Sequence, residues 1–217
     1  MVRTRADREP PERVPNEVRR TRTRAAILDA AETRIVERGF ASTTIDSLAP
    51  DAGVSKGAVY FHFGSKDELL EALLIRSQET VFAPALALLN DPGESSATAR
   101  VIAFFNRIGS LDHLGRYLLP VIVSVQGSAI LPAARARLDE LSDSIRHGLR
   151  GAIEQGQSTG EFDSPLPPAE LAAITMALMD GMLLQWHRFG GLIDGSQFLR
   201  AGRRALLGAL QVRPPTW

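Results

Sequence analysis

An all-α fold is the prediction for this 217-residue chain, and three observations lead to it. Alanine, leucine and arginine dominate the composition, whereas aromatic residues make up only 6%, a bias that favours helix over strand. Apolar residues recur at helical spacing in several segments, beginning with Ile27, Leu28, Ala31 and Ile35. No segment alternates polar and apolar residues for long enough to predict a strand. We therefore expect about nine helices around a sizeable core.

The N-terminus is predicted to be a mobile arm followed by the first helix. Residues 1–18 mix arginine, acidic residues and prolines without helical spacing. The helix is expected to start near Arg19 and to end at Gly39, which suits a C-terminal cap. Its start carries a basic run without an acid, made of Arg19, Arg20, Arg22 and Arg24. This run is explained equally well by contact with a DNA backbone or minor groove and by a solvated helix start.

A second, shorter helix is expected before Gly53, which breaks it. Thr43 and Asp46 form an imperfect capping box at its start. Pro50 removes the hydrogen bond to the carbonyl of Asp46 and disfavours helical backbone at Ala49. The second helix is therefore expected to be shortened or kinked.

The later helices follow from caps and breaks. Ser55 can cap a third helix, which a Gly-Ser pair at 64–65 ends, and a fourth continues to Leu89. Asp91, Pro92 and Gly93 then break the chain. Further helices are expected over 95–109, 112–127, 132–155, 168–189 and 196–210. Pro120 should kink or break the sixth helix.

The segment between the second and third helices carries the strongest functional signal. Gly53 supplies the backbone freedom that a tight helix-turn-helix corner needs. Gly57 lies inside the next helix, where glycine costs roughly 1 kcal/mol relative to alanine. Such a residue suggests that another backbone comes close, and a DNA phosphate at the helix start would be favoured by the helix dipole.

Polar groups follow within about three helical turns. Lys56, Tyr60, His62 and Lys66 are cationic or hydroxyl-bearing, and Lys56 and Lys66 are the only lysines in the chain. Val59 and Phe63 would form the buried side of the third helix. The 25 basic and 25 acidic residues cancel, so the chain is not generally basic, and any positive surface for DNA must be local.

At these residues the chain resembles the DNA-binding domain of the tetracycline-repressor (TetR) family. The matching segments are Ile27-Leu28-Asp29-Ala30-Ala31, Gly39-Phe40, Thr43-Thr44, Leu48-Ala49, Ala52 to Gly57, Tyr60 to Phe63 and Ser65 to Leu70. The resemblance covers about 45 residues, and Pro50 departs from the helix former that the family usually carries there. It implies an Ω-shaped homodimer that binds double-stranded operator DNA and a small-molecule effector. It also implies an arm over 1–18, a DNA-binding domain over 19–65 and a ligand-binding and dimerisation domain over 66–217.

By matching position, the resemblance also implies the DNA contacts. They are Thr44, Ser55, Lys56, Gly57, Ala58, Tyr60, His62 and Lys66. Tyr60, His62 and Lys66 would hold phosphates, which position the protein. Lys56 and Ala58 would reach base edges. The contact of Thr44 depends on a second helix that Pro50 disturbs.

Two long apolar helices close the chain. The stretch from Leu171 to Trp186 is apolar nearly all round and, at this length, indicates a buried helix rather than a membrane span. The last helix has an apolar stripe, from Phe198 to Leu210. In the family, the last two helices form an intersubunit four-helix bundle, which implies a homodimer here.

A ligand pocket in the larger domain would be mostly apolar. Its candidate residues are Phe82, Phe105, Tyr117, Met176, Met179 and Trp186. Methionine adapts to varied apolar shapes, although ordinary core packing explains the same residues. His113, Gln126 and His187 are candidate polar anchors, or surface and core residues.

Other classes of protein fit less well. Without cysteine, thiolate zinc sites and cysteine nucleophiles are excluded, and the histidines lack metal-ligand spacing. The letters G-x-S-x-G occur around Ser158, but a helix is expected before that serine and an extended loop after it. We therefore expect no enzyme and no cofactor. A helical protein-interaction module would explain the last two helices but not Gly57 with its polar neighbours. The charged N-terminus is no secretory signal, so a cytoplasmic protein without a membrane partner is expected.

Overall fold

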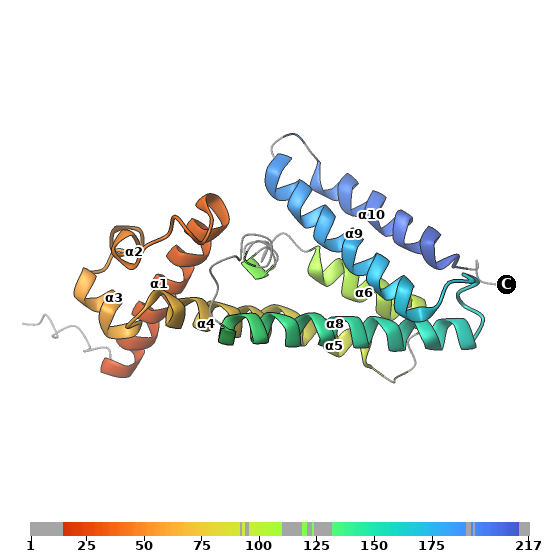
Figure 1. The fold of residues 1–217 in the computed structure, drawn as a ribbon, viewed down its shortest axis with the longest axis horizontal. Helices are drawn as coiled ribbons and strands as arrows, with labels where there is room; N and C mark the ends of the chain where they lie inside the picture. The colour runs from red at the N-terminus through yellow and green to blue at the C-terminus, as the bar shows by residue number, and fades with distance from the viewer. Residues whose placement is uncertain are drawn as a thin grey trace, which may run out of the picture.

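The structure is a computed structural model, and in the part of the chain that it describes all elements are helices, apart from one isolated bridge between Phe162 and Val212 (Figure 1). The described residues are 15–91, 93, 96–109, 119, 120, 123, 132–189, 192 and 194–212. A small group of three helices lies at one end and a larger helical body at the other, with α4 leading from one to the other. The helices are α1 (Asn16–Arg38), α2 (Ile45–Asp51), α3 (Lys56–His62), α4 (Lys66–Ser77), the π-helical turn η1 (Gln78–Phe82), α5 (Ala83–Leu89), α6 (Ala97–Ile108), α8 (Pro132–Ser158), α9 (Pro168–Phe189) and α10 (Gly195–Leu210).

The expected all-α fold is confirmed, and most helices have the expected bounds. Gly39 ends α1 with a positive φ of 84°, and its N–H donates to the carbonyl of Ile35. The helix starts at Asn16, earlier than the predicted Arg19, so only residues 1–14 of the predicted arm lie outside the described residues. The helix expected over 112–127 also lies almost wholly outside them. Of that segment Leu119, Pro120 and Val123 are described, all helical and buried.

The cap predicted for α2 is wrong by one residue. Thr44 is the N-cap, and its side chain and that of Ser47 each accept from the other's backbone N–H. Thr43 is instead buried, and its hydroxyl donates to the carbonyl of Gly39 at 3.0 Å. Because the Thr43 hydroxyl bonds this carbonyl, the side chain of Thr44 caps the helix instead.

Pro50 is tolerated inside α2. The helix continues to Asp51, and Ala49 before the proline is helical and buried. The helix has only seven residues, so the missing N–H of Pro50 removes one hydrogen bond close to its end. The side chain of Asp51 then pairs with Arg34 of α1 at 2.7 Å, which ties α2 to the first helix.

One long helix joins the two groups, with a π-helical turn in its middle. The helices α4 and α5 are continuous through η1, where the hydroxyl of Thr80 donates to the carbonyl of Arg76. Among the described residues, Lys66–Leu89 is the one helix long and apolar enough to cross a membrane. Core helices of soluble proteins pass the same test, and the leucines of α4 are buried against other helices of the protein.

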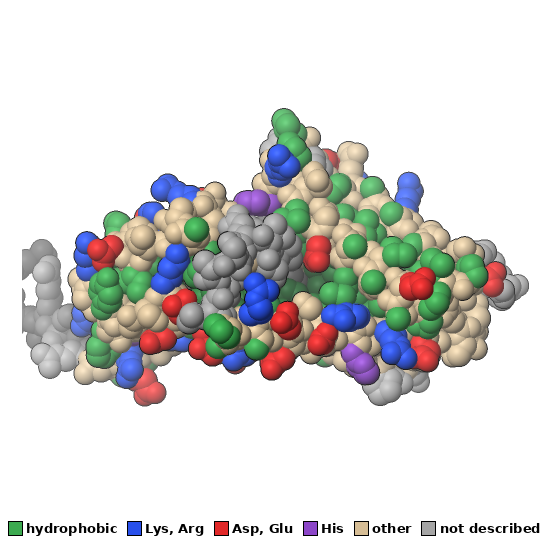
Figure 2. All heavy atoms as spheres, viewed as in Figure 1, with side chains coloured by type: hydrophobic (Ala, Val, Ile, Leu, Met, Phe, Trp, Pro, Cys, Tyr) green, Lys and Arg blue, Asp and Glu red, His purple; other side chains and the backbone are tan. Residues whose placement is uncertain are grey.

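Buried side chains form two hydrophobic clusters. One unites the buried faces of α1, α2 and α3 with the first half of α4, and reaches Leu138 of α8. The other fills the space between α5, α6, α8, α9 and α10. Because α4 belongs to the first cluster, a core shared with the three N-terminal helices continues past residue 65. On the face shown in Figure 2, charged side chains line the edge over α8, and apolar ones gather over α9 and α10.

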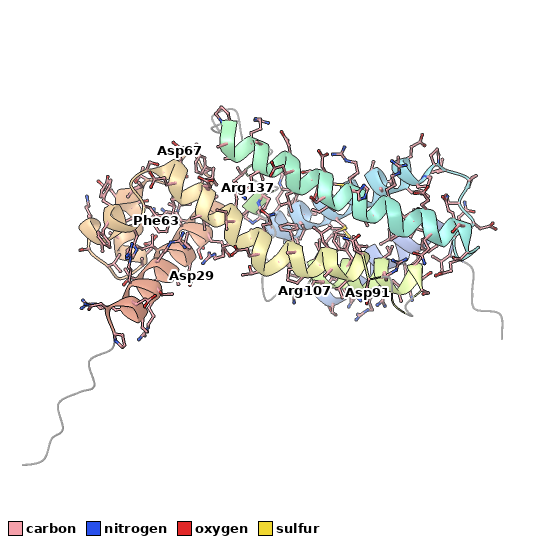
Figure 3. All side chains as sticks on the ribbon, turned by 90° about the horizontal axis from the view of Figure 1, so that it is seen from below. Asp29, Phe63, Asp67, Asp91, Arg107 and Arg137 are labelled. Atoms are coloured by element: carbon pink, nitrogen blue, oxygen red, sulfur yellow. The ribbon has the colours of Figure 1, made fainter. Side chains whose placement is uncertain are left out.

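Ionic contacts reinforce the connection along α4. Arg76 pairs with Asp29 of α1 at 2.6 Å and also with Glu32 of the same helix. Arg137, which lies on α8 beside α4 in Figure 3, pairs with Glu71 at 3.5 Å. The helix α4 is therefore held by charge to a helix of each group.

Candidate nucleic-acid interface and ligand cavity

The helices α2 and α3 meet at a tight corner. Gly53 has a positive φ of 64°, which glycine adopts at little cost. The N–H of Ala52 and that of Val54 both donate to carbonyls of α2, at 2.9 and 3.0 Å. These bonds close the end of α2 and turn the chain directly into α3, as a helix-turn-helix corner requires.

The helix α3 has one buried and one exposed side. Its N-cap is Ser55, whose hydroxyl accepts from the N–H of Ala58 at 3.2 Å. Val59 and Phe63 are buried, as predicted, and fix the helix to the core of the first cluster. Lys56, Gly57 and Tyr60 are exposed on the other side. Lys56 and Tyr60, two of the polar groups singled out in the sequence, therefore face away from the core, whereas His62 is only partly exposed.

Gly57 has open space where a side chain would be. An added Cβ would meet only the hydroxyl of Ser55, at 4.0 Å. No packing within the described part of the chain explains a glycine here, although alanine would favour the helix. The open space leaves room for a molecule outside the protein.

Asp46 binds the side chains of two residues that were predicted to contact DNA, Lys56 and Tyr60. Its carboxylate pairs with the amino group of Lys56 at 3.0 Å and accepts from the hydroxyl of Tyr60 at 3.2 Å. The bond from Lys56, its charge and the bond from Tyr60 lower the pKa of Asp46. This carboxylate was not among the predicted site residues, because ten residues separate it from Lys56 in the sequence.

Lys66 is partly buried at the start of α4. Its amino group donates to the carbonyl of Ala41 at 3.3 Å and lies 4.1 Å from the centre of the Phe40 ring. Burial lowers its pKa, and the nearby Asp67 opposes this shift. The amino group therefore has partners within the protein, which a phosphate would have to join or replace.

Two arginines of α1 make cation–π contacts with aromatic rings at the end of α3. The guanidinium of Arg20 lies 5.4 Å from the centre of the Phe61 ring, and that of Arg24 lies 5.1 Å from the Phe63 ring. Phe61 is 70% exposed, so this ring has little cover besides Arg20. Burial, and then the charges of the two arginines, lower the pKa of His62.

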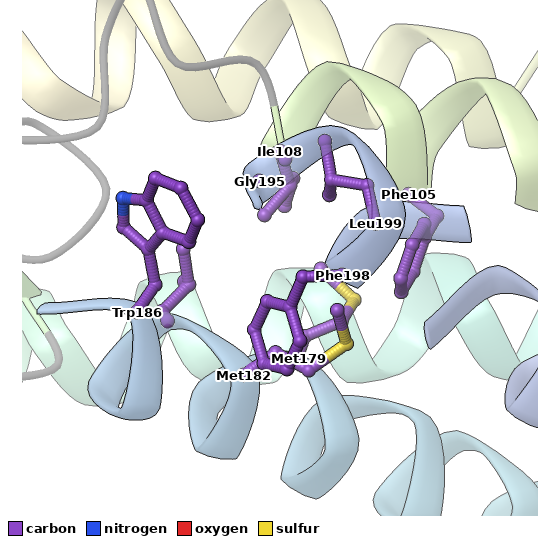
Figure 4. A pocket seen from close by; sticks show the side chains of 10 residues that line it. Phe105, Ile108, Met179, Met182, Trp186, Gly195, Phe198 and Leu199 are labelled. Carbon is purple, nitrogen blue, oxygen red and sulfur yellow. The ribbon is translucent and has the colours of Figure 1, made fainter. Parts of the chain in front are cut away.

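The larger domain contains a small apolar cavity between α6, α9 and α10, with a volume of about 30 Å³ (Figure 4). Its lining side chains include Phe105, Met179 and Trp186, three of the residues predicted for a pocket. Met182, Phe198 and Leu199 complete much of the wall. The last two were visible in the sequence only as part of an apolar stripe.

Other predicted pocket residues lie elsewhere. Phe82 is buried in the core of the body, and Met176 packs against that core, so neither lines the cavity. Tyr117, His113 and Gln126 lie outside the described residues. His187 is exposed near the end of α9. Of the five predicted pocket residues that the structure describes, three therefore line this cavity and two do not.

Ser158 has no strand before it. The helix α8 ends at this residue, and its hydroxyl donates to the carbonyl of Gln155 at 2.8 Å. A nucleophile elbow needs a strand before the serine and a helix after it. The G-x-S-x-G letters are a helix end here.

Two short helices that meet at a glycine corner, with small and cationic groups exposed on the second, define a helix-turn-helix protein. Comparison with known families agrees. Residues 27–73 match the model of bacterial regulatory proteins of the tetR family, and residues 127–211 match the C-terminal model of BetI-type transcriptional repressors.

Similar proteins cover most of the chain. The transcriptional regulator TtgR of Pseudomonas putida is 30% identical over 208 residues, which span 82% of this chain and 88% of TtgR. The transcriptional repressor BepR of Brucella suis is 27% identical, with the same shares covered. The crystal structure of the MbdR regulator from Azoarcus sp. CIB superposes with a TM-score of 0.78 at 30% identity, covering 87% of this chain and 98% of MbdR.

The chain belongs to the TetR family. It is a DNA-binding transcriptional regulator of the helix-turn-helix class, and its C-terminal half matches a repressor model. The relatives that it resembles are transcriptional regulators rather than enzymes.

Proposed function

We propose that this chain represses transcription as a homodimer on a palindromic operator and releases the DNA when a small, mostly apolar molecule binds. The exposed side of α3 carries this proposal, because a glycine without internal packing lies there beside Lys56 and Tyr60. The proposed division is an arm over 1–18, a DNA-binding domain over 19–65 and a ligand-binding and dimerisation domain over 66–217. The protein would act in the cytoplasm, without a cofactor or a membrane partner.

The proposed DNA contacts differ in what they do. Lys56 and Ala58 would reach base edges in the major groove, where small side chains near the start of α3 permit close approach. Tyr60, His62 and Lys66 would bind phosphates and set the position of the helix. Thr44, Ser55 and Gly57 would approach the backbone. Thr44 and Ser55 are exposed N-caps, so their hydroxyls lie at the surface of the corner.

The cavity is proposed as the core of the effector site. A volume of about 30 Å³ is far below the roughly 300 Å³ of a typical ligand pocket, so side chains must move for an effector to enter. Met179 and Met182 line it, and methionine repacks easily. Trp186 lies at the edge of the cavity in Figure 4, where a bound molecule would change its environment.

Signal transfer is proposed to follow α4. This helix shares a core with the N-terminal helices and pairs through Arg76 with α1, while Arg137 of α8 pairs with it from the body. A molecule that shifts the body would move both recognition helices. The ligand must bind one arrangement more tightly, and coupling of about 1–3 kcal/mol is typical.

Dimerisation is proposed through α9 and α10. Both helices have exposed small residues at helical spacing, which lets another helix approach closely. They are Ala173 and Ala177 on α9, and Ala201, Ala205 and Gly208 on α10. Ile174, which is 46% exposed, lies beside the first set. A second copy would cover this face and place two α3 helices on half-sites about 34 Å apart.

Binding to the DNA upstream of the protein's own coding sequence tests the proposal. We expect footprints over two half-sites related by a dyad, about one helical turn apart. Replacing Lys56 with alanine should change the preference between operators, whereas uniform weakening would make Lys56 a phosphate contact. A lack of sequence-selective binding at moderate salt, with and without ligand, would overturn the regulatory function.

Effector binding can be followed through Trp186. The chain has two tryptophans, so Trp217→Phe leaves Trp186 as the only one. A panel of small apolar molecules is titrated against this variant bound to its operator. We expect an effector to change Trp186 emission at the same concentration at which it releases DNA. Release without any change in Trp186 emission would place the effector elsewhere.

A further inference from the structure

The arginines of α1 are not equivalent in the structure. Arg20 and Arg24 are one helical turn apart, and each lies over an aromatic ring near the end of α3. At 100° per residue, Arg22 points to the opposite side of α1. Within the basic run, Arg20 and Arg24 therefore lie beside the recognition helix, whereas Arg22 is a solvated arginine on the other side of α1.

The contact with a ring leaves N–H donors of each guanidinium available, because a cation–π contact uses none of them as a hydrogen bond. A guanidinium has five such donors, which suit a phosphate. Within the described part of the chain, neither Arg20 nor Arg24 has a carboxylate partner. Both are exposed. Two cations that no described carboxylate neutralises thus lie at the surface.

His62 lies between the two stacks. The centre of its ring is 5.3 Å from that of Phe61 and 6.4 Å from that of Phe63, the two rings that carry the arginines. The charged groups that act on His62 are Arg20 and Arg24, both from α1. Among the described residues that line the same hollow on α1 as the two arginines, Glu17 is the acidic one and Arg76 is a further cation.

We propose that Arg20, Arg24 and His62 form a phosphate-binding site that holds the DNA backbone beside the recognition helix. The inference rests on the proposed placement of α3 in DNA, and it adds a contact from a helix outside the helix-turn-helix. The exposed Phe61 then has a role, as the platform that orients Arg20. Such contacts would strengthen binding to all sequences without reading bases.

Proton uptake should accompany binding at this site. In the free protein burial and the two arginines lower the pKa of His62 below its usual value, so the ring is neutral near pH 7. A phosphate favours the charged ring and raises this pKa in the complex. Because the complex then binds more protons than the free protein, affinity should rise as the pH falls between the pKa of the complex and that of the free protein.

The test uses the full chain and a duplex that it selects from a random-sequence library. Arg20→Ala and Arg24→Ala are compared with Arg22→Ala, which removes the same charge from the other side of α1. We expect the first two each to weaken binding about tenfold and to lower the salt slope by about one per subunit. Arg22→Ala should change affinity less than about twofold. Equal effects of all three variants would overturn the site.

The pH arm tests the histidine. Between about pH 7.5 and pH 5.5, the affinity of the wild type should rise up to about tenfold per pH unit for each subunit, and His62→Gln should remove this rise. A flat wild-type profile would remove His62 and overturn the site as proposed. Thermal melting checks folding, and Arg20→Gln and Arg24→Gln replace any alanine variant that melts early. If the wild type selects no duplex, the DNA-binding function itself fails, which is a different result.

Discussion

Gly57 in the N-terminal helices and Gly156 in the body of the protein have opposite surroundings. At Gly57 of α3 an added Cβ would meet only the Ser55 hydroxyl at 4.0 Å, whereas at Gly156 of α8 it would lie 2.3 Å from the ring of Phe162. Gly195 is similarly close to the ring of Trp186, at 2.5 Å. Gly156 and Gly195 thus make room for the protein's own side chains. The space at Gly57 is unused, as it is at Gly151 and Gly181 of the body, but at Gly57 it lies on the proposed DNA face.

The largest effect on stability should come from adding a methyl group at Gly156, where the space is already occupied. Gly156→Ala places a methyl group against the buried ring of Phe162, which has little freedom to move. We expect a loss of about 1–3 kcal/mol in the free energy of unfolding, the usual cost of overpacking. Urea denaturation measures it.

The matched control lies one and a half turns earlier in the same helix. An added Cβ at Gly151 meets nothing within 4 Å, so Gly151→Ala should stabilise the protein by up to about 1 kcal/mol. Equal effects of the two substitutions would show that the ring of Phe162 yields, and the contrast between the two kinds of glycine would weaken.

Gly57→Ala should separate stability from function. Because the space is open and alanine favours helix, the free energy of unfolding should stay equal or rise by up to about 1 kcal/mol. Affinity for a selected duplex should fall about tenfold, since the methyl group enters the space proposed for the DNA backbone. Fluorescence anisotropy measures affinity, with Gly151→Ala as the control that leaves it unchanged. Full affinity in Gly57→Ala would mean that the open space is not used.

Lys66→Ala should weaken binding to all duplexes several-fold and lower the salt slope by about one per subunit. In the free protein its amino group contacts the Ala41 carbonyl and the Phe40 ring, so some stability should be lost as well. The slope distinguishes the two roles, since a purely structural lysine leaves it unchanged. An unchanged slope would remove Lys66 from the phosphate contacts.

Asp46→Asn should have the smallest effect. Loss of the carboxylate frees Lys56 and Tyr60 and removes a negative charge from the proposed DNA face, so binding to all duplexes should strengthen a few-fold. Exposed ion pairs contribute only about 0–1 kcal/mol, which limits the change. Asp51→Asn is the control, because Asp51 lies on the same helix but pairs with Arg34. Weaker binding in Asp46→Asn would instead make Asp46 a residue that positions Lys56 for DNA.

Local features of the sequence were sufficient for most of the N-terminal helices. The glycine cap at Gly39, the glycine turn at Gly53 and the serine cap at Ser55 were predicted and are present. The error at Thr43 arose where two neighbouring threonines could both cap, and burial of one decided between them. Pro50 was expected to disturb α2, but a proline near the end of so short a helix costs little.

Contacts between distant residues could not be predicted in the same way. Asp46 holds Lys56 because α2 and α3 cross at the corner, and the cavity unites Phe105, Met179 and Phe198 from three different helices. Met176 and Phe82 are apolar like the residues that line the cavity, but they pack in the core of the body and do not reach it. Residue type indicated an apolar wall, but the direction of each side chain depended on how the helices pack.

The sequence by itself determined the helical class, the helix-turn-helix corner and its small, cationic second helix. These depend on backbone preferences and hydrogen bonds between residues a few positions apart, which the order of residues states directly. The tertiary structure alone decided which cations are paired and at which glycines a neighbouring side chain occupies the space of a Cβ. It also decided that Arg20 and Arg24 rather than Arg22 lie beside α3. Those outcomes depend on which helix faces meet, and that is set by packing across the whole chain.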